Sequence, residues 1–62
     1  MNQYNLRLRL ISFIENERIT QKKIAEESGV PTDIVSRFKN NRRELYRESA
    51  EALNRYLDSK GY

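Results

Sequence analysis

Apolar residues recur at helical spacing from the amino end of the chain. The run NLRLRL alternates as a strand would, but no turn and second strand follow it. We therefore favour a helix, which Asn2 or Asn5 can cap and which ends in the run ENERI. Leu8 projects away from the apolar face of this helix. The residues that form that face are Leu6, Leu10, Phe13 and Ile14.

Two shorter helices are predicted in the middle of the chain, on either side of a glycine. Thr20 can cap the first of them, QKKIAEES, and Gly29 ends it. Its inward positions are Ile24, Ala25 and Ser28.

A proline marks the start of the second short helix. Pro31 pushes Val30 toward extended angles, so the chain turns there and a helix follows from about Thr32 to Lys39. Asn40 and Asn41 can close this helix, because asparagine tolerates the left-handed conformation.

A last helical pattern runs from Glu44 to about Ser59, and Gly61 marks its end. Ser49 and Tyr56 border its apolar side. That side consists of Tyr46, Ala50, Leu53 and Leu57. The sequence therefore predicts one all-α domain over residues 1–62, a compact four- to five-helix domain with a central helix-turn-helix.

Composition narrows the function. The 62 residues are 37% apolar and 34% charged, which suits a small folded helical domain rather than a disordered tail. The chain has no cysteine and no histidine, which excludes a closed zinc site and removes the commonest general base. Glu26 and Glu27 diverge by about 100° on a helix and form no acid-base pair. We expect no enzyme activity, no cofactor and no small-molecule ligand.

No apolar run is long enough for a membrane span or a signal peptide, so we expect the chain to act in the cytoplasm, where it is made. The net charge of +3 hides a segregation of charge along the chain. Bases dominate the stretch from Val30 to Arg47, where Asp33 and Glu44 are the acids. Such a locally positive surface attracts polyanions, although a charge cluster is often only a solvated face.

Two short helices joined by a glycine-containing turn form a helix-turn-helix, which carries Thr20-Gln21 at its start and small or apolar residues at Ala25, Gly29-Val30, Val35 and Phe38. This set resembles the helix-turn-helix of the phage lambda-type repressor and Cro superfamily. The flanking helices extend the similarity over nearly the whole chain, and Val35-Ser36-Arg37 is also similar to the recognition helix of the lactose-repressor family. The chain departs from the family at Pro31, where serine or threonine is usual, and this leaves the cap of the third helix open. The resemblance implies a sequence-specific regulator of transcription, of phage, plasmid or bacterial origin, that binds a double-stranded DNA operator.

Helical phase separates the polar side of residues 32–39 from its apolar side, Ile34, Val35 and Phe38. The polar side can lie in the major groove, where Arg37 can donate two hydrogen bonds to guanine and Asp33 can accept one from cytosine. Alternatively, Asp33 holds Arg37 in place four residues away, or Thr32 and Asp33 merely begin a helix. The candidate base-reading residues are Thr32, Asp33, Ser36 and Arg37.

Candidates for the DNA backbone flank this helix. Gln21 begins the preceding helix, where free amides favour an anion and where family members carry a backbone-contacting glutamine. The loop after the helix offers donors and positive charge at Asn40, Asn41, Arg42 and Arg43.

Residues left over from the predicted core suggest a partner. One short helix reads too few base pairs to single out an operator, so we expect a possible homodimer on a palindrome. The residues left over are Leu8, Tyr46, Tyr56 and Tyr62, and those near the carboxyl end, Tyr46, Tyr56 and Tyr62, are the candidates for its interface. They could instead cover the edge of the monomer's core or simply be exposed. The alternative function is an antirepressor or adaptor that uses the same fold and surface to bind another protein.

Overall fold

The computed structural model of the protein describes residues 2–62, and they form four α-helices without a strand. The helices are α1 (Gln3–Glu17), α2 (Gln21–Ser28), α3 (Thr32–Lys39) and α4 (Arg47–Ser59). The predicted all-α architecture is confirmed, with four helices. None of the described helices is long and apolar enough to cross a membrane.

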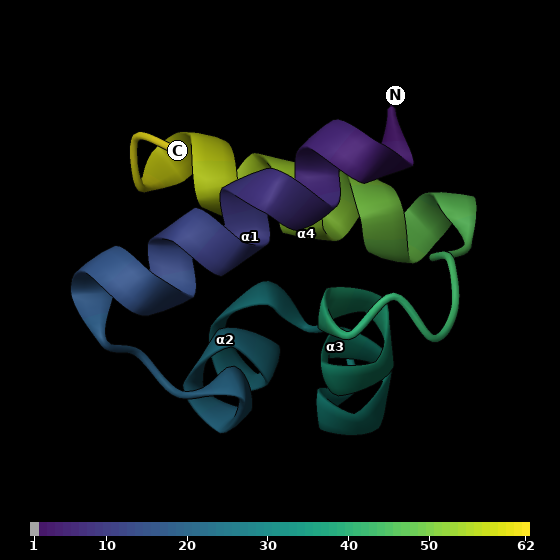
Figure 1. Ribbon diagram of the computed structural model, residues 1–62, viewed down its shortest axis with the longest axis horizontal. Coiled ribbons are helices and arrows are strands. Elements are labelled where there is room, and N and C mark those ends of the chain that lie inside the picture. Colours follow the sequence, from purple (N-terminus) through teal and green to yellow (C-terminus); the bar gives the residue numbers. More distant parts are fainter. Residues whose placement is uncertain (1) are drawn as a thin grey trace.

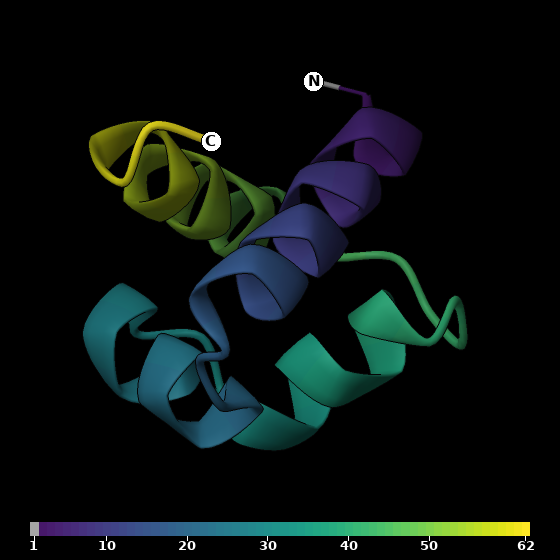
Figure 2. The ribbon, with the colours of Figure 1, turned by 60° about the vertical axis from the view of Figure 1, so that its left-hand side comes forward.

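The helices are arranged in two tiers. In Figure 1, α1 lies in front of α4, and α2 and α3 lie side by side beneath them. The rotated view in Figure 2 shows the same two tiers, with both ends of the described chain on the side away from α2 and α3. The α2–α3 pair therefore leaves its lower surface free of the other two helices.

Local signals fix the ends of the first three helices. The Asn2 side chain accepts hydrogen bonds from the backbone N–H groups of Tyr4 (2.8 Å) and Asn5 (3.2 Å), and Thr20 accepts one from Lys23 (3.1 Å). These contacts satisfy amides that have no partner within the first turn of a helix. Gly29 ends α2 at φ 83°, where a residue with a side chain would be strained.

The start of α3 lacks a side-chain cap, because Pro31 stands at the capping position and its side chain has no hydrogen-bonding group. Its end is well determined, because Asn41 takes the left-handed conformation at φ 60°. The N–H of Asn41 then donates to the carbonyl of Phe38 (3.1 Å), and that of Arg42 donates to Arg37 (2.8 Å). This pair of bonds is the Schellman arrangement, which closes a helix and turns the chain away from its axis.

One core joins the two tiers. Phe13 of α1 meets the ring of Tyr56 edge-on at 5.6 Å and that of Tyr62 at 5.1 Å between centroids. The buried residues of the core are Leu6, Leu10, Phe13, Ile24, Val30, Val35, Phe38, Leu45, Ala50, Leu53, Tyr56 and Leu57. Leu8 lies outside it, 45% exposed, as its helical phase predicts.

The prediction for the start of the last helix is wrong. A helix from Glu44 would place Tyr46 on the core side with Ala50, but α4 begins at Arg47 and Tyr46 is extended at ψ 158°. The extended residue breaks the helical phase, so Leu45 enters the core at 6% exposed and Tyr46 is 76% exposed.

Candidate nucleic-acid interface

The α2–turn–α3 unit packs through the residues that carry the family resemblance. Ile24 of α2, Val30 of the turn and Val35 and Phe38 of α3 are all buried, and Ala25 packs half-buried against them. These contacts fix which side of α3 faces the protein. The opposite side is left for solvent or for a partner.

The exposed side of α3 is the one that helical phase predicts. Thr32, Asp33, Arg37 and Asn40 are exposed, and Ser36 is half-buried between them and the core. At the carboxyl end of the helix, an open depression of about 520 Å³ is lined by Ser36, Arg37, Asn40 and Arg42. The structure thus brings two predicted base-reading residues together with two predicted backbone-binding residues.

The charges around this depression are not neutralised within the described part of the chain. Ion pairs among residues 2–62 join Arg9 to Asp58, Arg47 to Glu51, and both Lys23 and Lys60 to Glu27. None of them includes Arg37 or Arg42, and Asp33 does not pair with Arg37. The alternative in which Asp33 holds Arg37 is therefore not realised in this structure. Both guanidinium groups remain available to an external acceptor.

The other predicted backbone contacts occupy different surroundings. Arg43 is half-buried, donates from Nε to the carbonyl of Glu44 (3.1 Å) and stacks 5.3 Å from the Tyr46 ring centroid. Gln21 is half-buried at the start of α2. Asn41 is exposed, and its backbone closes α3. Their contacts with DNA stay predictions.

Two of the tyrosines predicted for a dimer interface have contacts within the monomer, as the alternative for these residues expects. Tyr56 is 8% exposed and donates from its hydroxyl to Glu27 (2.5 Å), which ties α4 to α2. Burial is the main cause that raises the pKa of Tyr56, and the hydrogen bond to Glu27 raises it further. The same hydrogen bond lowers the pKa of Glu27. Tyr62 is half-buried against Phe13 and donates to Glu17 (2.7 Å). A partner could reach Tyr46 without disturbing the core, but not Tyr56.

Two residues of α1 that were not predicted as site residues contact the backbone on either side of residues 40–43, at Phe38 in α3 and at Leu45 before α4. Arg7 donates from Nε to the carbonyl of Phe38 (2.7 Å), and Gln3 exchanges two hydrogen bonds with the backbone of Leu45 (both 3.0 Å). Their spacing of four residues shows that they share one flank of a helix. No pattern in the sequence predicts these contacts, because they join residues 31 and 42 positions apart.

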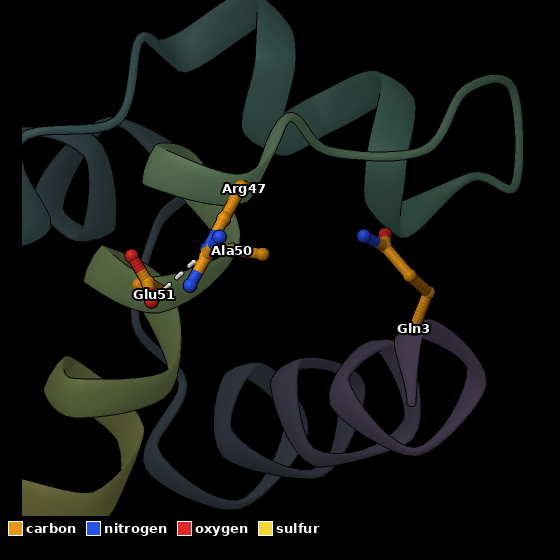
Figure 3. Close-up of a pocket in the computed structure, with 4 residues that line it drawn as sticks. All are labelled: Gln3, Arg47, Ala50 and Glu51. Atoms are coloured by element: carbon orange, nitrogen blue, oxygen red, sulfur yellow. Dashed lines mark ion pairs between the residues drawn. The ribbon is translucent and has the colours of Figure 1, made fainter. Parts of the chain in front are cut away.

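A second pocket lies between the amino-terminal ends of α1 and α4. It measures about 490 Å³ and is lined by Gln3, Arg47, Ala50 and Glu51. Figure 3 shows Gln3 across the opening from the ion pair of Arg47 and Glu51, which are 3.6 Å apart. None of these residues lies on α3, so this pocket is not part of the predicted DNA surface.

Within the described residues, no cluster of acidic, histidine or cysteine side chains could hold a metal ion. Comparison of the chain with protein-family models, with curated proteins and with solved structures gave no match.

Proposed function

We propose that the chain is a sequence-specific regulator of transcription that binds double-stranded DNA with α3 in the major groove. The observation that carries this proposal is the state of Arg37. It is exposed on the outer side of α3 beside Ser36, Asn40 and Arg42, and it forms no ion pair within residues 2–62. An unpaired arginine on the free side of a short helix suits a base edge, because its planar fork matches the two acceptors of guanine.

The neighbouring residues divide into two roles in this proposal. Thr32, Asp33 and Ser36 lie on the same side of α3 as Arg37 and read the adjacent base edges. Arg42 stands at the carboxyl end of the helix, where it meets a phosphate, with Asn40 and Asn41 beside it. Gln21 and Arg43 contact the DNA phosphate backbone on either side of the bases that α3 reads.

Each copy of α3 spans too few base pairs to identify one operator, so two copies act together on an inverted repeat. Regulation then follows from occupancy of the operator. Of the predicted interface residues, Tyr46 is exposed enough for the second copy to contact, and Leu8, which is outside the core, is exposed as well. Sedimentation of the protein with a selected duplex tests this arrangement. A single protomer on a non-palindromic site contradicts it.

Salt dependence separates DNA binding from the alternative, an antirepressor or adaptor that binds a protein. Each phosphate contact releases counterions, so the affinity for duplex should fall steeply with salt, by about 0.9 logarithmic units per contact for each tenfold rise. If the surface instead binds a protein, the chain should show no salt-dependent affinity for duplex DNA. Absence of duplex binding at low salt would refute the proposal.

Arginine variants test the two roles. Arg37→Ala should cost about 1–3 kcal/mol of specific binding and relax the preference at one base position. The free energy of unfolding of this variant should stay within about 0.5 kcal/mol of the parent's, because the Arg37 side chain has no ion-pair partner among residues 2–62 to lose. Equal loss of affinity on every sequence would contradict base reading by Arg37.

Arg42→Ala should weaken binding to all duplexes and reduce the salt slope by about one. Arg55 is a matched control, because it is exposed on α4 and forms no ion pair in the described chain. Arg55→Ala removes the same charge and should leave the slope nearly unchanged. If both variants give the same slope, Arg42 contacts no phosphate.

A further inference from the structure

Side chains of α1 contact the last turn of α3 and Leu45, on either side of the basic segment at residues 40–43. At the far end, the side-chain amide of Gln3 donates to the carbonyl of Leu45 and accepts from its N–H, both at 3.0 Å. At the near end, the Nε of Arg7 donates to the carbonyl of Phe38 at 2.7 Å. Gln3 and Arg7 are four residues apart on one flank of α1. Two side chains from one rigid helix therefore set where the segment leaves α3 and where it enters α4.

The Gln3 contact replaces the pairing that secondary structure would give. Leu45 precedes α4 and lies outside any helix, so its backbone groups need partners from elsewhere once its side chain is buried. The amide of Gln3 carries an NH2 donor group and a carbonyl acceptor in the same plane, which lets it satisfy both backbone groups of Leu45 at once. The buried side chain of Leu45 and the Gln3 amide together anchor this end of the segment.

The Arg7 contact anchors the other end through the last turn of α3. Within residues 2–62 Arg7 forms no ion pair, and its guanidinium lies 4.6 Å from the centroid of the Phe38 ring. The carbonyl of Phe38 is one of the last in α3, at the negative end of the helix dipole. The charge of Arg7 offsets that negative end, which would otherwise repel a phosphate placed beside it.

Asn40, Asn41, Arg42 and Arg43 lie between the two anchors. We propose that Gln3 and Arg7 are positioning residues that hold this basic segment ready for the phosphates of duplex DNA that flank the bases read by α3. The inference rests on the proposed function and adds residues that touch no DNA. A loop that is already ordered in the free protein loses less conformational entropy when it binds, so the affinity for DNA is higher.

Positioning and direct contact with phosphate have different signatures. Gln3→Ala removes both hydrogen bonds to Leu45 without removing any charge. It should weaken duplex binding about tenfold, because the segment must now be ordered on binding. The salt slope should not change, because no phosphate contact is lost. Arg7→Ala should behave in the same way. A slope reduced by about one would mean that Arg7 itself contacts a phosphate and would overturn its assignment.

Hydrogen exchange of the Leu45 amide tests the anchor without DNA. In the parent this N–H donates to Gln3, so Gln3→Ala should speed its exchange about tenfold or more. Gln3→Glu keeps the acceptor for the Leu45 N–H but sets a carboxylate oxygen against the Leu45 carbonyl, so it should retain only part of the protection. It also adds a negative charge beside the basic segment, so its affinity for duplex reports that charge as well as the anchor. Asn5→Ala is the control, since Asn5 is exposed on α1 and its side chain has no partner among residues 2–62.

The experiment measures the affinity for duplex over a range of salt and the exchange rate of the Leu45 amide, and circular dichroism reports the folded fraction. The proteins compared are the parent, Gln3→Ala, Gln3→Glu, Arg7→Ala and Asn5→Ala. A loss of affinity in both Gln3→Ala and Arg7→Ala at constant salt slope, with Asn5→Ala equal to the parent, supports the inference. Loss of Leu45 protection with undiminished duplex binding overturns it, and so does unchanged protection in Gln3→Ala. If Gln3→Ala does not fold, Arg7→Ala decides by its affinity and salt slope, and Gln3→Glu by the exchange of the Leu45 amide alone. A parent that binds no duplex refutes the proposed function instead, while exchange still reports the anchor.

Discussion

Leu45 and Tyr46 are adjacent residues whose substitution should have opposite consequences for stability. Leu45 is 6% exposed in the core, whereas Tyr46 is 76% exposed at the start of α4. Leu45→Ala removes three buried carbon atoms, worth about 2.4 kcal/mol at about 0.8 kcal/mol each, and leaves a cavity that adds to the loss. The segment before α4 is outside any helix and can partly collapse into that cavity. We therefore expect a total cost of about 2.5–3.5 kcal/mol.

Tyr46→Ala should cost less than about 1 kcal/mol, because the exposed ring loses only its contact with the Arg43 guanidinium. Urea unfolding followed by far-UV circular dichroism measures both values, and equal slopes confirm that the two variants unfold from comparable states. A larger cost for Tyr46→Ala than for Leu45→Ala would refute the reasoning. It would mean that α4 begins before Arg47 with Tyr46 in the core.

Three further predictions concern the ties and turns of the fold. The pKa of Tyr56 is raised above its ordinary value of 10.0 by burial and then by its bond to Glu27, so its contribution to stability is full below pH 10 and is lost above it. Urea unfolding at a series of alkaline pH values should show a shallower decline for Tyr56→Phe than for the parent, and parallel declines would contradict this origin. Gly29→Ala should cost about 1–2 kcal/mol, because φ is 83° although nothing lies within 4 Å of an added Cβ; a thermal melt equal to the parent's would place the turn elsewhere. Asn41→Val should cost about 1–2 kcal/mol and Asn41→Gly almost nothing, because φ is 60° at this residue and glycine adopts a positive φ without the strain that valine would have. Equal free energies of unfolding in urea for the two variants would argue against a left-handed residue here.

Much of the fold could be predicted because its signals are local. The bounds of α2 and α3 follow from Thr20, Gly29 and Pro31, which act on their own stretch of backbone whatever packs around them. The left-handed residue at Asn41 is also a local preference. The exposed side of α3 then follows from helical phase alone once Val35 and Phe38 are assigned to the core.

The features that were missed depend on contacts between distant segments. Tyr46 shares a helical spacing with Ala50, and nothing in the sequence shows that the chain is extended there. Gln3 pairs with Leu45, which is 42 residues away. Tyr62 reaches Phe13 because Gly61, at φ 82°, turns the chain back after α4. Such pairings are set by tertiary packing, which overrides periodicity at the ends of helices.

The candidate site divides in the same way. Exposure of Arg37 could be predicted from its place on α3, but its lack of an ion pair could not, because Asp33 stands four residues before it. The position of Arg42 beside Arg37 depends on the Schellman turn at Asn41. The anchors at Gln3 and Arg7 required the three-dimensional arrangement of α1.

Selection of bound duplexes from a random pool tests most directly whether α3 reads DNA. We expect an enriched inverted repeat whose half-sites lie about one helical turn apart. A parallel selection with Arg37→Ala should lose the preference at one position of each half-site and keep the rest. Enrichment of no sequence by the parent, or the same enriched motif with and without the Arg37 side chain, would contradict the account.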